Sequence, residues 1–433
     1  VQNIFAGESD TLRIGFSPTE SSFESSTITI KSNSFGNKTF TFKASGAGID
    51  ESAKDTVHLY VSPEGDDAND GKSSTSPLKT FTQVIKRIEQ LNRPPQPQMN
   101  PVPAPGAGNP IIGTPEDYRE EILSHLENLL YPVVVHVMPG WYWLDNRVKI
   151  DNNVGGNVHF KGEWTEDAAS DIRSLMETKG TNPVWLELPT DKIPVVSGGR
   201  KIENWTSTTV NGVGAWVAEL PEVSSGDWYF KQLFVNGQRA TRSRWPKKGF
   251  FRITEILPAT SGEQTDKTDR VKIRDGDMQK WKNITDIEMV HLHRWVDERM
   301  PVKKFEPASN VVTLQYQPAY AMHGSHPSHG AGLSPYFFDH VFETISEPGE
   351  WYLDRKEGKL YYIPRAGETM DNAEVVAPKL LSLFRVEGNA SNNQYLWNVS
   401  FHRMGFMHTD NLLEDHIGTG NGNTYGDGAI SVE

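Results

Sequence analysis

The sequence contains no cysteine among its 433 residues. Disulfide frameworks and thiolate metal sites are therefore excluded. No apolar run approaches the roughly 20 residues that a membrane-spanning helix needs, so we expect no membrane span. Basic residues are fewer than acidic ones, with 43 Lys and Arg against 56 Asp and Glu, and the formal net charge is −13. This balance argues against a nucleic-acid partner, because phosphate binding requires clustered Lys and Arg.

Turn-forming and aromatic residues are abundant instead. The chain holds 37 Gly, 27 Pro and 12 Trp, which is typical of a turn-rich but ordered protein. Trp rings stack on the apolar faces of sugar rings, although most Trp residues in a folded protein belong to the core. The length predicts two to four structural units.

The first predicted unit covers residues 1–50. Its apolar residues alternate with polar ones, as at Leu12, Ile14 and Phe16, and this pattern predicts strands. The segment resembles the second half of the Ig-like modules that precede catalytic domains in many secreted bacterial proteins. It is too short for a closed sandwich of about seven strands, so we expect a partial Ig-like module.

Residues 51–199 form the second predicted unit. The run HLYVSPEGDDANDGKSSTSPLKTF resembles the opening of many right-handed parallel β-helix proteins, where a strand and a short helix cap the solenoid. A Pro-rich insertion follows at residues 93–115. The run YPVVVHVMPGWYWL then predicts a buried strand and a turn, which we interpret as the first rung.

Two further units complete the predicted organisation. Residues 200–377 show strand patterns without a helical period and predict an inserted antiparallel β domain, in which EWYLDRKEGKLYYIP forms a hairpin. Residues 378–433 contain short apolar runs spaced like successive rungs of a solenoid. The chain stops inside one of these runs, so we expect the rungs to continue past Glu433. The predicted fold class is thus all-β.

Several runs together resemble one family: GGRKIENWT, LFVNGQRATRSRWP, EPGEWYLDRKEGKLYYIPRAGE, VSFHRMGFMHT and GDGAISVE. They are similar to the β-helix enzymes of glycoside hydrolase family 141, which include α-L-fucosidases and xylanases. The resemblance implies a secreted enzyme that hydrolyses a fucose- or xylose-containing plant or algal polysaccharide. It also implies an acidic catalytic pair on later rungs, so we expect this chain to lack activity by itself.

Two alternatives stay open for the function. A β-helix polysaccharide lyase would share the opening and the style of the rungs, and a noncatalytic glycan-binding surface protein would need no catalytic pair. Each of the three functions implies a polysaccharide or oligosaccharide partner and an extracellular, periplasmic or cell-surface location. The oligomeric state cannot be predicted from these patterns.

Two motifs are candidates for substrate binding. In MHGSHPSHGAG, His323, His326 and His329 could contact sugar hydroxyls, bind a transition metal or only order a loop. No carboxylate or thiolate lies nearby in the sequence to complete a rigid site, so we predict no tightly held metal. In ATRSRWP, Arg242 and Arg244 beside Trp245 could hold an acidic sugar or form a structural Arg–Trp pair.

A third motif, GDDANDG, carries Asp66, Asp67 and Asp70 in a turn. Oxygen-rich turns bind Ca²⁺, but the distal Glu of an EF-hand is missing, and Asx turns explain the composition by themselves. We therefore predict no cofactor, with Ca²⁺ as the alternative.

The last candidates lie near the end of the chain. Asp410 and Asp427 are the acidic residues offered for catalysis on the rungs, and His408 is a candidate for substrate binding. Glycoside hydrolysis requires two carboxyl groups across one sugar. The alternative is that this stretch forms only a rim that contacts substrate.

Overall fold

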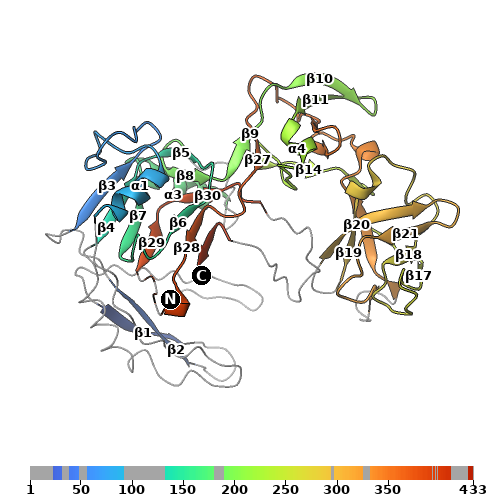
Figure 1. Ribbon diagram of the computed structural model, residues 1–433, viewed down its shortest axis with the longest axis horizontal. Helices are drawn as coiled ribbons and strands as arrows, with labels where there is room; N and C mark the ends of the chain where they lie inside the picture. Colours follow the sequence, from blue (N-terminus) through green and yellow to red (C-terminus); the bar gives the residue numbers. More distant parts are fainter. Residues whose placement is uncertain are drawn as a thin grey trace. The chain divides into compact units, whose positions relative to one another are not determined.

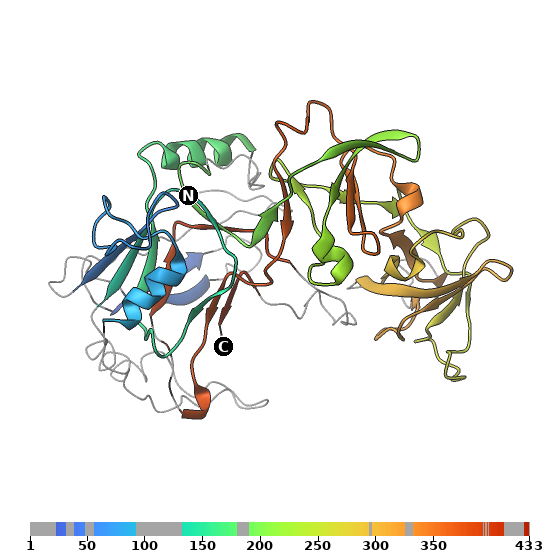
Figure 2. The ribbon, with the colours of Figure 1, turned by 45° about the horizontal axis from the view of Figure 1, so that its top comes forward.

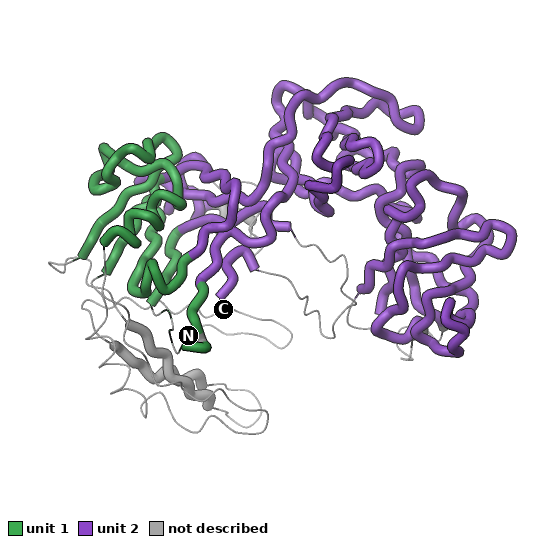
Figure 3. The backbone as a smooth tube through the Cα atoms, viewed as in Figure 1, with its two compact units in different colours: residues 1–138, 150–163, 387–403 green, residues 139–149, 164–386, 404–433 purple. Residues whose placement is uncertain are grey.

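The structure is a computed structural model that describes residues 23–31, 39–47, 56–91, 132–179, 190–293, 297–324, 332–392, 394, 396, 398–410 and 428–432. These residues form many strands and few helices, so the predicted all-β class is confirmed (Figure 1). Two compact units are present, each assembled from separate chain segments (Figure 3). Within the described ranges, no helix is long and apolar enough to cross a membrane.

Unit 1 contains residues 1–138, 150–163 and 387–403. Its main sheet is parallel, with strand order β29-β7-β4-β3. The strands are β3 (Val57–Val61), β4 (Val133–Val137), β7 (Val158–Gly162) and β29 (Val399–His402). The run of β4, VVVHV, is rich in Val and buried at four of its five positions, as expected of a parallel strand that is covered on both faces.

Helix α1 (Phe81–Glu89) packs on this sheet in unit 1 (Figure 2). Thr80 begins the helix as its N-cap and accepts a hydrogen bond from the Gln83 N–H. The Phe81 ring lies 6.1 Å from that of Phe160 on β7. A short helix was expected here from the resemblance to β-helix openings, and the side chains of Val84, Ile85 and Ile88 on it are buried.

The N-terminal hairpin of unit 1 consists of β1 (Phe23–Lys31) and β2 (Thr39–Ala47), which pair antiparallel. This agrees with the strands expected there. An Ig-like origin stays a prediction.

Unit 2 contains residues 139–149, 164–386 and 404–433. One of its sheets is parallel, with order β30-β8-β5, and another has order β31-β28-β6 with β28 and β31 parallel. The strands are β5 (Gly140–Trp143), β6 (Val148–Ile150), β8 (Pro194–Ser197), β28 (Phe384–Val386), β30 (Gly405–Met407) and β31 (Ile430–Val432). Helix α3 (Ala168–Lys179) precedes β8.

The chain visits these three sheets in a fixed order. It runs through β4, β5 and β6, then through β7, β8 and β28, and finally through β29, β30 and β31. Each group of three contributes one strand to each sheet, and strands one group apart are neighbours. A long segment, residues 199–378, separates β8 from β28 in the second group, and we call it the excursion.

The excursion begins and ends at adjacent positions. β9 (Gly199–Lys201) pairs antiparallel with β27 (Val375–Pro378), so that Gly199 lies opposite Pro378. Between them, a five-stranded sheet has order β10-β11-β26-β25-β14, and a four-stranded sheet has order β13-β12-β27-β9. Their remaining strands are β10 (Thr206–Val210), β11 (Val213–Glu219), β12 (Phe234–Val235), β13 (Gln238–Arg239), β14 (Thr241–Arg242), β25 (Glu350–Asp354) and β26 (Lys359–Tyr362).

An eight-stranded sheet completes the excursion. Its strands are β15 (Arg244–Trp245), β16 (Phe251–Arg252), β17 (Glu255–Ile256), β18 (Arg270–Lys272), β19 (Glu288–Leu292), β20 (Asp297–Glu306), β21 (Val311–Leu314) and β24 (Pro335–Asp339). A small ladder joins β22 (His323–Gly324) to β23 (Gly332–Leu333). The short helices of unit 2 are α4 (Pro221–Ser225), η2 (Ile284–Asp286) and η4 (Phe342–Thr344), and η5 (Ala390–Asn392) lies in unit 1.

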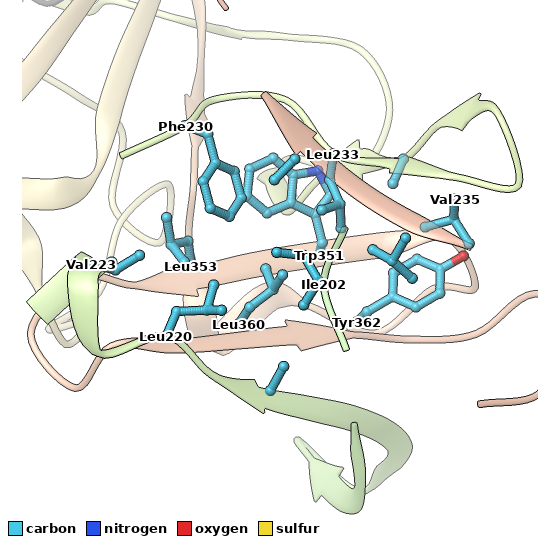
Figure 4. Close-up of a cluster of buried hydrophobic side chains, with 14 of the residues drawn as sticks. Ile202, Leu220, Val223, Phe230, Leu233, Val235, Trp351, Leu353, Leu360 and Tyr362 are labelled. Carbon is cyan, nitrogen blue, oxygen red and sulfur yellow. The ribbon is translucent and has the colours of Figure 1, made fainter. Parts of the chain in front are cut away.

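Large aromatic side chains fill the core of the excursion. Trp351, Phe230 and Tyr362 are fully buried with Leu353 and Leu360 (Figure 4). Burial of each apolar side chain of this size contributes about 1.5–3 kcal/mol to stability. The predicted hairpin is confirmed, since β25 and β26 pair antiparallel.

Candidate functional site

The ends of three neighbouring strands in unit 2 form a cluster of rings. Trp141 and Trp143 lie on β5, Ser197 ends β8, and His408 follows β30. The rings of Trp141 and Trp143 stack with their centroids 5.2 Å apart, and His408 stacks at 5.9 Å from Trp141. Parallel strands bring these residues to one edge because their carboxyl ends align.

His408 is the buried centre of this cluster. Its backbone has a φ of 59°, and its Nδ1 lies 2.9 Å from Ser197 Oγ, within hydrogen-bond distance. Burial lowers the pKa of His408 to about 4, so the ring is neutral near pH 7. A neutral imidazole with one nitrogen bound to a hydroxyl can donate or accept a single further hydrogen bond.

Two glycines allow the close approach of the excursion to His408. A Cβ atom on Gly199 would lie 2.4 Å from Val376 Cγ1 and 2.9 Å from His408 Cβ. A Cβ atom on Gly198 would lie 2.6 Å from Leu383 Cδ2. The Gly198–Gly199 pair therefore lets the chain leave β8 directly beside the ring cluster.

A small hollow of about 170 Å³ opens beside Trp143. Its lining includes Asp145, Arg200 and Lys201. The Nζ atom of Lys201 lies 5.0 Å from the centroid of the Trp143 ring and 2.5 Å from a carboxylate oxygen of Glu374. The hollow thus combines an aromatic surface with both hydrogen-bond donors and an acceptor.

Of the two acidic candidates for catalysis, the structure describes only Asp410. Asp410 is buried in unit 2, and its backbone N–H donates to the Leu380 carbonyl at 2.9 Å. Asp427 lies outside the described residues. A catalytic role for either residue stays a prediction, as does a substrate contact by His408.

Arg242 belongs to a buried network of ion pairs. Its guanidinium lies 2.7 Å from Glu288 and 3.1 Å from Asp339. Lys231 pairs with Glu288 at 2.7 Å, and Arg299 pairs with Asp339 at 2.7 Å. Burial by itself lowers the pKa of Arg242, but Glu288 and Asp339 raise it well above its usual range. The guanidinium is therefore charged and held by protein carboxylates.

Arg244 and Trp245 lie on a different sheet from Arg242. β14 pairs with β25, whereas β15 pairs with β24. The Arg244 guanidinium donates to the carbonyls of Pro246 and Gly249 and stacks 3.9 Å from the Phe337 centroid. Trp245 lies opposite Phe338 in the ladder. Sugar contacts by these residues stay predictions.

The histidine motif is only partly described. His323 lies on β22 opposite Leu333, whereas His326 and His329 lie outside the described residues. Among the residues that the structure describes, no three His, Asp or Glu side chains are grouped to hold a metal ion. The proposal that this loop holds no metal stays a prediction.

The Asp-rich turn in unit 1 uses its carboxylates to accept hydrogen bonds from backbone N–H groups. Asp66 accepts from the Ala68 N–H, Asp70 from the Lys72 N–H, and Asp67 from the N–H groups of Lys79 and Thr80. The contacts of Asp66 and Asp70 are the Asx-type contacts expected of such a turn, whereas Asp67 holds the start of helix α1 at a separation of 12 and 13 residues.

Sequence reasoning missed the partners of Arg242. Glu288 and Asp339 lie 46 and 97 residues from it in sequence, and no spacing rule joins them. One signal was available, because Glu288 is an acidic residue inside the strand run EMVHL, where an unpaired charge would be costly.

Two comparisons with known proteins give matches to this chain. Residues 214–365 match the family described as the GH141 insertion domain. A solved structure titled "Glycoside hydrolase" is similar over 82% of this chain, with 21% identity and a TM-score of 0.55. This chain spans about half of that structure, 51% of its length. No curated protein sequence matches the chain significantly. The fold is therefore similar to that of a glycoside hydrolase, with a GH141-type insertion within the excursion.

Proposed function

We propose that the protein is a glycoside hydrolase built on a right-handed parallel β-helix. The order in which the chain visits three sheets carries this proposal, because a solenoid of three-sided coils requires one strand per sheet in each coil. The GH141 insertion match and the similar solved structure support it. The predicted unit at 200–377, which lies within the excursion, would then be an insertion into one coil, between 51–199 and 378–433.

The proposed substrate is a plant or algal polysaccharide that contains fucose or xylose, met outside the cytoplasm. The hollow beside Trp143 supports a sugar contact, because sugar sites combine an aromatic face with charged and polar groups. In this proposal His408 and its neighbours contact substrate, while the catalytic carboxylates lie on other coils.

Product analysis tests the reaction type. The longest natural chain that includes residues 1–433 would be incubated with fucosylated and xylose-based glycans. Hydrolysis releases a new reducing end without an unsaturated sugar. A product that absorbs in the ultraviolet, as a lyase leaves, would replace this proposal, and binding without turnover would favour a noncatalytic glycan-binding protein.

Substitution of Asp410 tests the placement of the chemistry. Because the proposal places the catalytic carboxylates on other coils, we expect Asp410→Asn to lower kcat less than tenfold. Loss of a general acid or base would lower kcat by about 10²–10⁴-fold. A loss in that larger range, with the fold intact, would make Asp410 part of the catalytic pair. Asp427→Asn is the parallel variant.

A further inference from the structure

A cleft of about 680 Å³ opens within the excursion of unit 2. Its walls come from α4, η2, the start of β19 and the turn between β25 and β26. Hydrogen-bonding side chains without charge line much of it, namely Ser224, Ser225, Asn283, Thr285 and Gln315. Such a lining suits a ligand with many hydroxyl groups.

The charged groups of the cleft are unequal in number. Three cations, Lys231, Arg355 and Lys356, line it together with two carboxylates, Asp286 and Glu288. In a chain of net charge −13, this local excess of positive charge needs an explanation. It favours an anionic ligand over a neutral one.

Both carboxylates of the cleft lie close to cations of the protein. Glu288 is held by Lys231 and also by Arg242, which approaches from behind the cleft at 2.7 Å. Asp286 is mostly buried, and this burial raises its pKa. Because Glu288 already pairs with two cations, the rim cations Arg355 and Lys356 share a single further carboxylate, Asp286.

The rim cations are placed to receive a ligand. The Arg355 guanidinium stacks 4.1 Å from the Tyr229 ring centroid and lies 3.7 Å from Asp286, beyond hydrogen-bond length. Lys356 is exposed beside it. Stacking fixes the guanidinium plane while its N–H edge can still bind a planar anion.

An exposed aromatic ring completes the cleft. Tyr316 is 37% exposed, which is unusual among the large hydrophobic side chains that the structure describes. A flat ring beside hydrogen-bond donors and cations is the combination that covers one face of a sugar while its charged substituent is held.

We propose that this cleft binds a negatively charged sugar residue, with Arg355 and Lys356 holding its anionic group and Tyr316 covering its ring. The charge is that of a uronate carboxylate or a sulfate ester, since both offer oxygens to a guanidinium. The inference rests on the proposed function only in taking the ligand to be a glycan. It assigns this cleft to recognition and not to bond cleavage.

Titration calorimetry with the whole chain tests the proposal. The probes are trigalacturonate, a sulfated galactose trisaccharide and neutral xylotriose. We expect one of the anionic probes to bind at least tenfold more tightly than xylotriose and to lose affinity as salt is raised. Equal binding of all three probes, or binding of none, would overturn the proposal. The better anionic probe identifies the source of the charge.

Variants connect the binding to this cleft. Arg355→Gln and Lys356→Gln should each weaken the anionic probe by about tenfold, in line with the loss of one charge-assisted hydrogen bond. Lys272→Gln is the matched control, because Lys272 is an exposed cation of unit 2 that does not line the cleft. Unchanged affinity in both cleft variants would contradict the assignment. Circular dichroism verifies folding.

The experiments distinguish a failure of the glycoside hydrolase proposal from a failure of the cleft assignment. If the anionic probe binds at the cleft but no glycan is hydrolysed by the longest natural chain, the glycoside hydrolase proposal falls and the cleft stands. If hydrolysis occurs while both cleft variants bind normally, only the cleft assignment falls.

Discussion

The cluster around His408 and the network around Glu288 bury polar groups in opposite ways. At His408 the ring is neutral and is surrounded by Trp141, Trp143 and the Ser197 hydroxyl. At Glu288 the groups keep their charges, because Arg242 and Lys231 lie at hydrogen-bond distance. Burial alone raises the pKa of Glu288, but these cations lower it far below its usual range.

The difference shows that the free-energy cost of burying a titratable side chain depends on whether that side chain can lose its charge. A histidine escapes the cost of burial by releasing a proton near neutral pH. An Arg cannot, so its burial requires fixed carboxylates on neighbouring strands. The first arrangement depends on pH, whereas the second depends on every partner being present.

Removal of one partner from the network should have the largest effect. Glu288→Gln leaves Lys231 and Arg242 buried with too little negative charge, and we expect it to lower the free energy of unfolding by about 3–5 kcal/mol. Urea unfolding followed by Trp fluorescence measures this. The exposed Glu255→Gln, which removes a 3.7 Å pair with Lys272, should change stability by less than about 0.5 kcal/mol. Similar effects of both variants would show that the network is not a coupled unit.

Acidification should affect the His408 cluster next. The pKa of His408 is about 4 in the folded protein and near 6.5 when unfolded, because burial disfavours the charged ring. The unfolded state therefore binds the proton first, and the stability from this residue is complete above pH 6.5 and is lost as pH falls towards 4. The loss amounts to about 3 kcal/mol.

The variant His408→Asn isolates this contribution, because Asn tolerates a positive φ. His291 and His340, whose pKa values are also lowered by burial, remain in both proteins and cancel in the difference. The stability difference between wild type and variant should shrink between pH 7 and pH 4. Parallel stability curves would mean that His408 titrates normally.

A substitution that crowds the side chains beside His408 should lower the stability of the protein by a smaller amount. Gly199→Ala adds a Cβ atom against Val376 and His408, and we expect a loss of about 1–3 kcal/mol from overpacking. Gly214→Ala is the matched control, because nothing lies within 4 Å of its added Cβ atom. Thermal unfolding of both variants measures the difference, and equal midpoints would contradict the tight junction.

Loss of a hydroxyl should have the smallest effect. Ser197→Ala removes the partner of His408 Nδ1 and of the Gly199 N–H, and it should lower stability by about 1 kcal/mol. Ser207→Ala on the exposed face of β10 is the control, with almost no expected change. An effect as large as that of Glu288→Gln would show that neutral and charged sites respond alike.

Local sequence patterns predicted where strands form but not which strands pair with one another. The Val-rich run of β4, the spacing of α1 and the turn of the β25–β26 hairpin are each contained in a few consecutive residues. In contrast, ATRSRWP has the pattern of one strand but is divided at Ser243. There the N–H group of Ser243 donates to Trp351 and its carbonyl accepts from His340. Contacts over such separations decide which sheet a strand joins, and no short-range rule contains them.

The pairing of Gly199 with Pro378 has a consequence for how this chain could have been assembled. To the strands before and after it, the whole excursion presents two ends as close as those of a tight turn. The β9–β27 ladder therefore offsets the entropy cost of bringing these two ends together. The length of the segment between β9 and β27 can therefore change without a shift in the register of the strands before and after it.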